Sequence, residues 1–295
     1  MVLYGMQIVS DIAFDIALPS QGEYKETIYL SSHVPSSFAQ ALTCGTYLHT
    51  THKHKIYLYS NQDIAQPMLK KQPFCYEVKG LLKFYWYHGE TTLYYKRQNA
   101  SLAQFTFWFT HPFFPLFLSM ESYYVLLHGS AIEIAGKSIL ILAPFHSGKS
   151  TFTHYINQQN NPLICDDILP TFIENGQIHY APSHPYSRPF REAETLGHRV
   201  PHYRHTFGKI DAIYILRNHQ TSLPTTICSV KGVEKFQCVK QNSIIYTLKN
   251  FRLTHEQYLG KLLNSLAFFI LDRPWGKEHL AKSYHTLKKH IEETL

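Results

Sequence analysis

The first 115 residues carry short runs in which apolar and polar residues alternate or aromatic residues predominate. Gly, Asn, Asp, Gln or Pro bounds each run, a pattern typical of β-strands joined by turns. The HGETT segment at residues 88–92 separates two aromatic runs and predicts a hairpin. We therefore expect a β-rich, antiparallel module over residues 1–115. The runs are MQIVSDIAF, TIYLSS, KIYLYS, LLKFYWYHG, TTLYYKR and AQFTFWF.

One aromatic run, FTFWFTHPFFPLFL at residues 105–118, is apolar enough to suggest a membrane segment. It contains two prolines and a histidine, and it is shorter than the roughly 20 residues that a spanning helix needs. The pattern predicts a strand followed by a turn into a helix, with no membrane partner. The segment Pro112–Pro115 marks the boundary that we expect between the two parts of the chain.

From Leu116 onward strands and helices alternate, which is typical of an α/β domain over residues 116–295. The Asn175-Gly176 pair predicts a tight hairpin turn within it. The expected elements are a helix in LFLSMESYYVLLHG, two strands in SAIEIAGKSILILA, a helix over residues 150–157, strands at 163–167 and 210–216, and a hairpin in FIENGQIHYAP.

Two amphipathic helices are expected to close the chain. Thr254 followed by Gln257 predicts a capping box at the start of the first. Its apolar face would comprise Leu259, Leu262, Leu263, Leu266, Phe269 and Ile270. The face of the second would comprise Leu280, Tyr284, Leu287, Ile291 and Leu295.

The stretch ILILAPFHSGKST at residues 139–151 places a strand before a loop and a helix-compatible segment after it. This is the context of a phosphate-binding loop, in which backbone N–H groups at a helix N-terminus surround a phosphate. Ala143 replaces the first glycine of that motif, and Pro144 removes one N–H. The alternative is an ordinary helix that a serine caps by chance. The residues expected to bind a nucleotide are Ser147, Gly148, Lys149, Ser150 and Thr151.

Asp166 and Asp167 end an apolar strand, 17 and 18 residues after Lys149. In a strand–loop–helix–strand unit, the loop and the strand end share the carboxyl edge of the sheet. One carboxylate can then hold Mg²⁺ while the other accepts a proton from an attacking hydroxyl. An Asp-Asp turn without function is the alternative.

Taken together, LLHGSAIEI, APFHSGKST and LICDD resemble the catalytic domain of HPr kinase/phosphorylase and its smaller HPr-kinase-like relatives. That family has a His-Gly or His-Ala pair before a strand, then the phosphate loop and an Asp-Asp strand end. Here the pair is His128-Gly129, 21 residues before Lys149, and the resemblance covers about residues 120–217. The opening LYGMQIVSDIAFDIALPS is similar to a branch with a β-rich N-terminal module. Some members of that branch phosphorylate serine on ribosomally made precursor peptides, including lasso peptides.

The resemblance implies an α/β, HPr-kinase-like fold and a serine-type kinase that uses ATP and Mg²⁺ on a peptide or small protein. It assigns Asp166 as general base, with His128 beside it to orient it. It gives Lys149 the task of stabilising charge on the β- and γ-phosphates. Ser150 and Asp167 are the residues expected to hold Mg²⁺.

The chain departs from the family after the Asp-Asp strand, where a Glu followed by Arg-Gly-Leu-Gly is missing. The segment HPYSRPFREAETLG occupies this region instead. The absence of the Glu and Arg-Gly-Leu-Gly signature argues against phosphorylase activity and against HPr as substrate. Arg188 and Arg191 in this segment are candidates for contact with phosphate or an acidic peptide, and a solvated loop is the alternative.

The composition limits the classes of binding partner and the cellular location that we expect. The 28 basic and 21 acidic residues give a net charge of +7, but the basic residues are dispersed and show no nucleic-acid signature. The five cysteines are odd in number and lack any CxxC, which favours reduced thiols in the cytoplasm. The N-terminus lacks the pattern of a signal peptide. The oligomeric state, a homo-oligomer included, is left open.

Three further hypotheses remain beside the peptide kinase. The first is a catalytically degenerate module that binds nucleotide or peptide, and the second is a small-molecule kinase. The third is a metal site at His198, His202 and His205, which Pro201 and the lack of a further ligand argue against.

Overall fold

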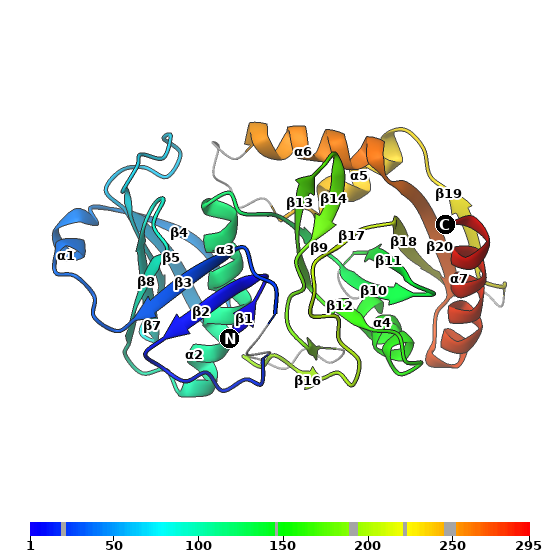
Figure 1. Cartoon of the computed structure of the whole chain (residues 1–295), viewed down its shortest axis with the longest axis horizontal. Coiled ribbons are helices and arrows are strands. Elements are labelled where there is room, and N and C mark those ends of the chain that lie inside the picture. Colours follow the sequence, from blue (N-terminus) through cyan, green and yellow to red (C-terminus); the bar gives the residue numbers. More distant parts are fainter. Residues whose placement is uncertain (19–21, 145–146, 189–193, 221–222, 245–251) are drawn as a thin grey trace. The chain divides into compact units, whose positions relative to one another are not determined.

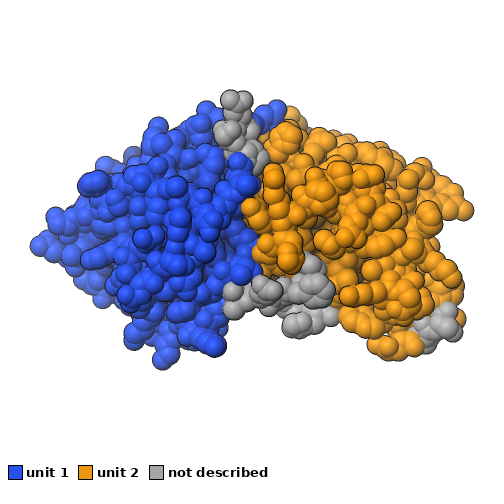
Figure 2. All heavy atoms as spheres, turned by 90° about the horizontal axis from the view of Figure 1, so that it is seen from below, with its two compact units in different colours: residues 1–123, 192–196, 245–253 blue, residues 124–191, 197–244, 254–295 orange. Residues whose placement is uncertain are grey.

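The computed structural model describes residues 1–18, 22–144, 147–188, 194–220, 223–244 and 252–295. The fold is mixed α/β, and the chain divides into two compact units (Figures 1 and 2). The first unit comprises residues 1–123, 192–196 and 245–253. The second comprises residues 124–191, 197–244 and 254–295.

An eight-stranded sheet forms the first unit, in the order β1-β2-β3-β8-β7-β6-β5-β4. The expected hairpin is confirmed, because β7 and β8 pair antiparallel on either side of Gly89. The expectation of a wholly antiparallel sheet is wrong, since β3 runs parallel to both β2 and β8. The strands are β1 (Val2–Leu3), β2 (Met6–Ser10), β3 (Glu26–Ser31), β4 (Cys44–Thr51), β5 (His54–Ser60), β6 (Pro73–Val78), β7 (Leu82–Tyr87) and β8 (Thr92–Arg97).

The aromatic run after β8 is helical, so the strand predicted there is wrong. A capping box between Ser101 and Gln104 starts the helix, and aromatic side chains are buried around its whole circumference, which hides the helical period. Phe113 stacks on Phe84 of β7 with ring centroids 4.2 Å apart, so the run packs against the sheet. The helices of this unit are α1 (Ser37–Ala41), α2 (Leu102–Trp108), the π-helical turn η1 (Phe109–Phe113) and α3 (Phe114–Met120). Within the described residues, every helix is too short or too polar to cross a membrane.

The second unit is built on a six-stranded sheet of order β12-β10-β11-β18-β20-β19, in which β11, β18 and β20 run parallel (Figure 1). A second sheet has the order β17-β14-β13-β9, and β15 pairs with β16. The strands are β9 (Val125–His128), β10 (Ser130–Ile134), β11 (Lys137–Leu142), β12 (Leu163–Cys165), β13 (Ile168–Glu174), β14 (Gln177–Tyr180), β15 (Tyr186–Ser187), β16 (His198–Arg199), β17 (Gly208–Lys209), β18 (Ala212–His219), β19 (Thr226–Ser229) and β20 (Ala267–Pro274). The helices are α4 (Lys149–Asn157), α5 (Val233–Asn242), α6 (Arg252–Ser265), the short η3 (Lys277–His279) and α7 (Leu280–Thr294).

Both faces of the six-stranded sheet are covered, which explains the unbroken apolar run of β11. Ile139 and Ile141 pack in one core with residues of α4 and α7. Leu140 and Leu142 pack in the other core with residues of α5 and α6. The sheet therefore lies between two helical layers, and its parallel strands direct their carboxyl ends toward one edge.

The strand and the helix expected around residues 139–157 are confirmed, as is the Asn175-Gly176 turn, where both residues have positive φ. Two expectations near the C-terminus are wrong. Helix α6 ends at Ser265, and Phe269 and Ile270 lie in β20 instead. This helix begins at Arg252, so Thr254 is inside it rather than at a capping box.

Alkylation of the cysteines provides a test of this fold. Burial raises the pKa of both the Cys75 and the Cys165 thiol to about 12, whereas Cys44 and Cys228 are exposed. At pH 8 only about one in 10⁴ of the buried thiols is thiolate, the form that reacts. Iodoacetamide is expected to label Cys44 and Cys228 in the native protein, and Cys75 and Cys165 only after unfolding, as read by peptide mass spectrometry. Fast native labelling of Cys165 would contradict the placement of β12 in the core.

Candidate active site

The loop between β11 and α4 adopts a backbone that the missing glycine does not strain. Ala143 is buried against Phe152 of α4 in the apolar core, and it is not among the residues with positive φ. A glycine is needed at Gly148, where φ is +77°. Phe145 and His146 lie outside the described residues. Alanine at position 143 therefore adopts its own backbone conformation without the cost that a positive φ would impose.

Gly148, rather than Ser147, is the N-cap of α4, and no side chain of the described residues forms a capping hydrogen bond there. The first amides of a helix have no partner within it, so they carry partial positive charge at this end. The structure therefore does not show the alternative, a helix capped by Ser147. The amides that begin α4 are available to an anion.

Lys149 links this helix terminus to the aspartates. Its side chain is buried, with 6% of the residue exposed, and Nζ donates to Ser130 Oγ at 3.2 Å. Ser130 Oγ in turn donates to Asp166 Oδ1 at 2.9 Å. No carboxylate within the described part of the chain lies within salt-bridge distance of Nζ. The ammonium is thus one hydroxyl away from the carboxylate at the end of β12.

Asp166 is held in place by three donors. Besides Ser130, Ser187 Oγ donates to its Oδ2 at 2.9 Å, and the backbone N–H of Arg188 donates to the same oxygen at 2.8 Å. A carboxylate has about four acceptor positions, so most of those of Asp166 are occupied. The residue is 4% exposed. These contacts suit a positioning group better than a base that must reach a substrate.

Asp167 is the more accessible aspartate, with 24% of its side chain exposed. Its Oδ1 lies 3.1 Å from Nδ1 of His128. The imidazole thus contacts Asp167, whereas the resemblance implies a place beside Asp166. Asp166 and Asp167 form the bend between β12 and β13, outside the paired residues of both strands, and this bend directs Asp167 toward the imidazole. Asp166 points the other way, toward Ser130.

Gly129 occupies a position where the packing leaves no room for a side chain. A Cβ at this position would lie 2.6 Å from Leu140 Cδ1 and 3.0 Å from the carbonyl oxygen of Ile141. The close approach brings the end of β9 against β11, so the His128–Asp167 pair sits beside the strand that leads into the loop.

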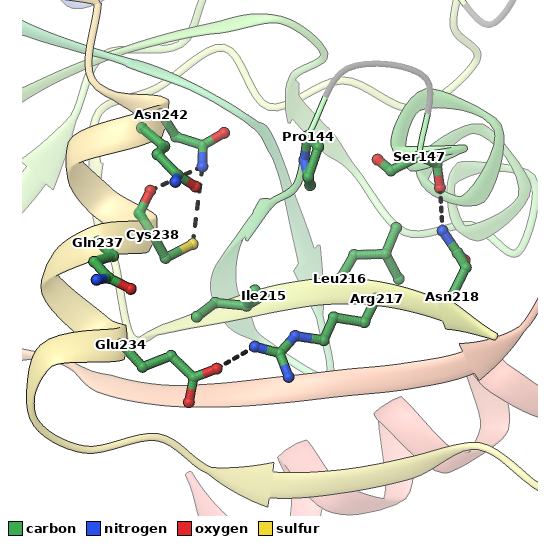
Figure 3. A pocket seen from close by; sticks show the side chains of 11 residues that line it. Pro144, Ser147, Ile215, Leu216, Arg217, Asn218, Glu234, Gln237, Cys238 and Asn242 are labelled. Carbon is green, nitrogen blue, oxygen red and sulfur yellow. Dashed lines mark hydrogen bonds and ion pairs between the residues drawn. The ribbon is translucent and has the colours of Figure 1, made fainter.

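A pocket of about 480 Å³ lies next to the loop, with Pro144 and Ser147 in its lining (Figure 3). It lies between α5, which contributes Gln237 and Asn242, and the carboxyl end of β18. Asn218 Nδ2 donates to the carbonyl oxygen of Ser147 at 2.6 Å. Asn218 Oδ1 and Ser147 Oγ are buried, and neither has a hydrogen-bond partner among the described residues. Neither aspartate lines this pocket.

The remaining predicted residues are placed as follows. Ser150 and Thr151 lie in the first turn of α4. Arg191 lies outside the described residues, and Arg188 contributes its backbone N–H to Asp166. Where the structure describes the chain, no group of three His, Cys, Asp or Glu residues is arranged to hold a metal, and His198, His202 and His205 are no exception.

The sequence patterns give little sign of three residues that shape this site. Ser130 directly follows the His128-Gly129 pair, and this position is the one sequence feature that could have identified it as a site residue. Ser187 and Asn218 are polar residues far away in the sequence, and only the fold brings them to the loop and to Asp166.

Comparisons with known proteins give a weak likeness to solved structures. Neither a protein-family model nor a curated protein matches the sequence. Among solved structures, the HPr(Ser) kinase/phosphatase from Coxiella burnetii is similar over 57% of this chain and 97% of that chain, with 12% sequence identity and a TM-score of 0.34. A TM-score of this size does not establish a common fold or activity. The chemistry of the site therefore rests on the side chains themselves.

Proposed function

We propose that the protein is an ATP-dependent kinase that transfers a phosphoryl group to a serine-type hydroxyl of a peptide or small protein. The observation that supports this most is the link from Lys149 through Ser130 to Asp166. It joins an uncapped helix N-terminus, a buried ammonium and a pair of aspartates in one place. Phosphoryl transfer needs such an arrangement, because it depends on positioning and on stabilising charge.

The residues present fit the phosphates of a nucleotide. A buried ammonium is unfavourable without an anionic partner, and no carboxylate of the described residues provides one, so the oxygens of a phosphate chain would neutralise Lys149. The buried Ser147 hydroxyl, which has no partner among the described residues, would donate to the same chain. We assign the amides of Gly148 to Thr151 to the phosphates. Ser150 and Asp167 would hold Mg²⁺, which neutralises charge between the phosphates when bound.

We assign His128 as the general base that accepts the proton of the acceptor hydroxyl. Histidine is the commonest general base, and a carboxylate against one ring nitrogen orients the ring and stabilises its protonated form. Asp167 provides that carboxylate here. Asp166 instead positions Ser130 and the segment that begins at Ser187. This assignment replaces Asp166 as the base, since its carboxylate already accepts three hydrogen bonds.

A peptide is the acceptor class that we favour, and a ribosomal natural-product precursor is the example that the sequence resemblance implies. Residues 183–208 contain four arginines and two glutamates, and Ser187 and Arg188 of this stretch donate hydrogen bonds to Asp166. A peptide bound along it would reach the aspartates. The assignment of Arg188 and Arg191 to this peptide remains a prediction.

The test is a transfer assay with labelled ATP, Mg²⁺ and serine-containing peptides encoded beside the gene, with small hydroxyl compounds in parallel. We expect label on a peptide serine, identified by mass spectrometry. Label on a small compound alone would assign the protein to the small-molecule kinases. Peptide binding without any binding of Mg·ATP, measured by calorimetry, would refute the kinase and support a degenerate binding module.

A further inference from the structure

Arg273 is a buried arginine at the carboxyl end of β20, beside the loop. The parallel register pairs it with Asn218 of β18, whose side chain binds the carbonyl of Ser147. Only 2% of Arg273 is exposed to solvent. Both side chains belong to strand ends at the edge of the sheet where the loop leaves β11.

The guanidinium of Arg273 has little to balance its charge. Its Nε and Nη1 are buried, and no residue in the described part of the chain accepts a hydrogen bond from either. Burial lowers its pKa from the usual value, and its contact is with the ring of Phe152, 5.2 Å from Cζ to the ring centroid. Asp272 is next to it in the strand, but successive strand residues point to opposite faces. A buried cation without an anion is costly, so the group indicates a missing anionic partner.

Two distances indicate that an anion at Gly148 would provide this partner. A Cβ built on Gly148 would lie 3.6 Å from Nη2 of Arg273 and 3.3 Å from the ring of Trp275. The space above this glycine is therefore bounded by a guanidinium and an indole. Lys149, the next residue, carries the other buried cation of this junction. Four buried polar atoms of Ser147, Asn218 and Arg273 have no hydrogen-bond partner among the described residues. These three residues are neighbours, since Asn218 binds the carbonyl of Ser147 and pairs with Arg273.

We propose that Arg273 is a second cation of the phosphate-binding loop and contacts the phosphate chain held at Gly148. The identification of the chain as that of a nucleotide rests on the proposed function. An arginine provides two parallel N–H donors that match two phosphate oxygens, whereas Lys149 acts as a point charge. Arg273 would thus favour a polyphosphate over a single phosphate.

The experiment compares Arg273→Met with the wild type. The control is Arg97→Met, which removes an exposed arginine of β8 in the first unit. Calorimetry with magnesium tripolyphosphate and with Mg·ATP measures affinity, and thermal unfolding without ligand measures stability. We expect Arg273→Met to weaken both ligands at least tenfold and not to lower the melting temperature of the free protein, because it removes an unpaired buried charge. Arg97→Met should change neither.

Two results would overturn the proposal while leaving the kinase intact. One is a variant with lower melting temperature and unchanged affinity for both ligands, which would make Arg273 structural. The other is unchanged affinity with a raised KM for the acceptor, which would assign the guanidinium to the peptide. Conversely, tripolyphosphate binding that depends on Arg273, without any transfer to an acceptor, would support the proposal and refute the kinase.

Discussion

Replacing Lys149 by methionine is expected to lower the rate of phosphoryl transfer by a factor of about 10²–10³, the usual effect of removing one preorganised group that stabilises developing charge. The protein should remain folded, since methionine fills similar space and removes a buried charge that has no carboxylate partner in the described structure. Ser130 would keep its hydrogen bond to Asp166. The rate is measured with labelled ATP, and the fold by thermal unfolding.

Lys289→Met is the matched control, because Lys289 is 75% exposed on α7 of the same unit. Its substitution should leave both the rate and the melting temperature unchanged. A Lys149→Met protein that is folded and fully active would remove the main support for the proposed chemistry.

Exchanging the two aspartates for asparagine is expected to separate their roles. Asp167→Asn removes the carboxylate that faces His128, so we expect turnover to fall by a factor of about 10²–10⁴ with little change in stability. Asp166→Asn places an amide where Ser187 and Arg188 donate hydrogen bonds, so we expect a lower melting temperature. Loss of buried hydrogen bonds to a charged group costs about 1.5–3 kcal/mol each.

Transfer kinetics at saturating ATP and thermal unfolding, measured on both variants, give the comparison. The opposite pattern, with Asp167→Asn active and Asp166→Asn stable but inactive, would restore Asp166 as the base. Such a result would show that its hydrogen bonds rearrange when the acceptor binds.

The parts of the site that lie close together in the sequence are predictable from it. The strand, the loop and helix α4 follow one another over residues 137–157, so local patterns and a single glycine at position 148 specify them. The strand ending in the aspartates is equally local. Ala143 looked unfavourable against the motif, but only its backbone dihedral decides the matter, and sequence does not give that angle.

The contacts between distant segments are not predictable in the same way. Whether His128 meets Asp166 or Asp167 depends on the bend at these two residues between β12 and β13, and no sequence pattern specifies how that bend directs the two side chains. Arg273 lies in a strand whose apolar residues continue the periodicity of α6, so the pattern predicts one helix where the chain forms a helix and a strand. For this reason the sequence pattern does not place Arg273 at a strand end near the loop.

A crystal structure with Mg²⁺ and a non-hydrolysable ATP analogue would test the central claim most directly. We expect the phosphate chain against the amides of Gly148 to Thr151, with Lys149 contacting it and the metal next to Ser150 and Asp167. An analogue bound away from this loop, or a loop left empty at saturating ligand, would contradict the claim.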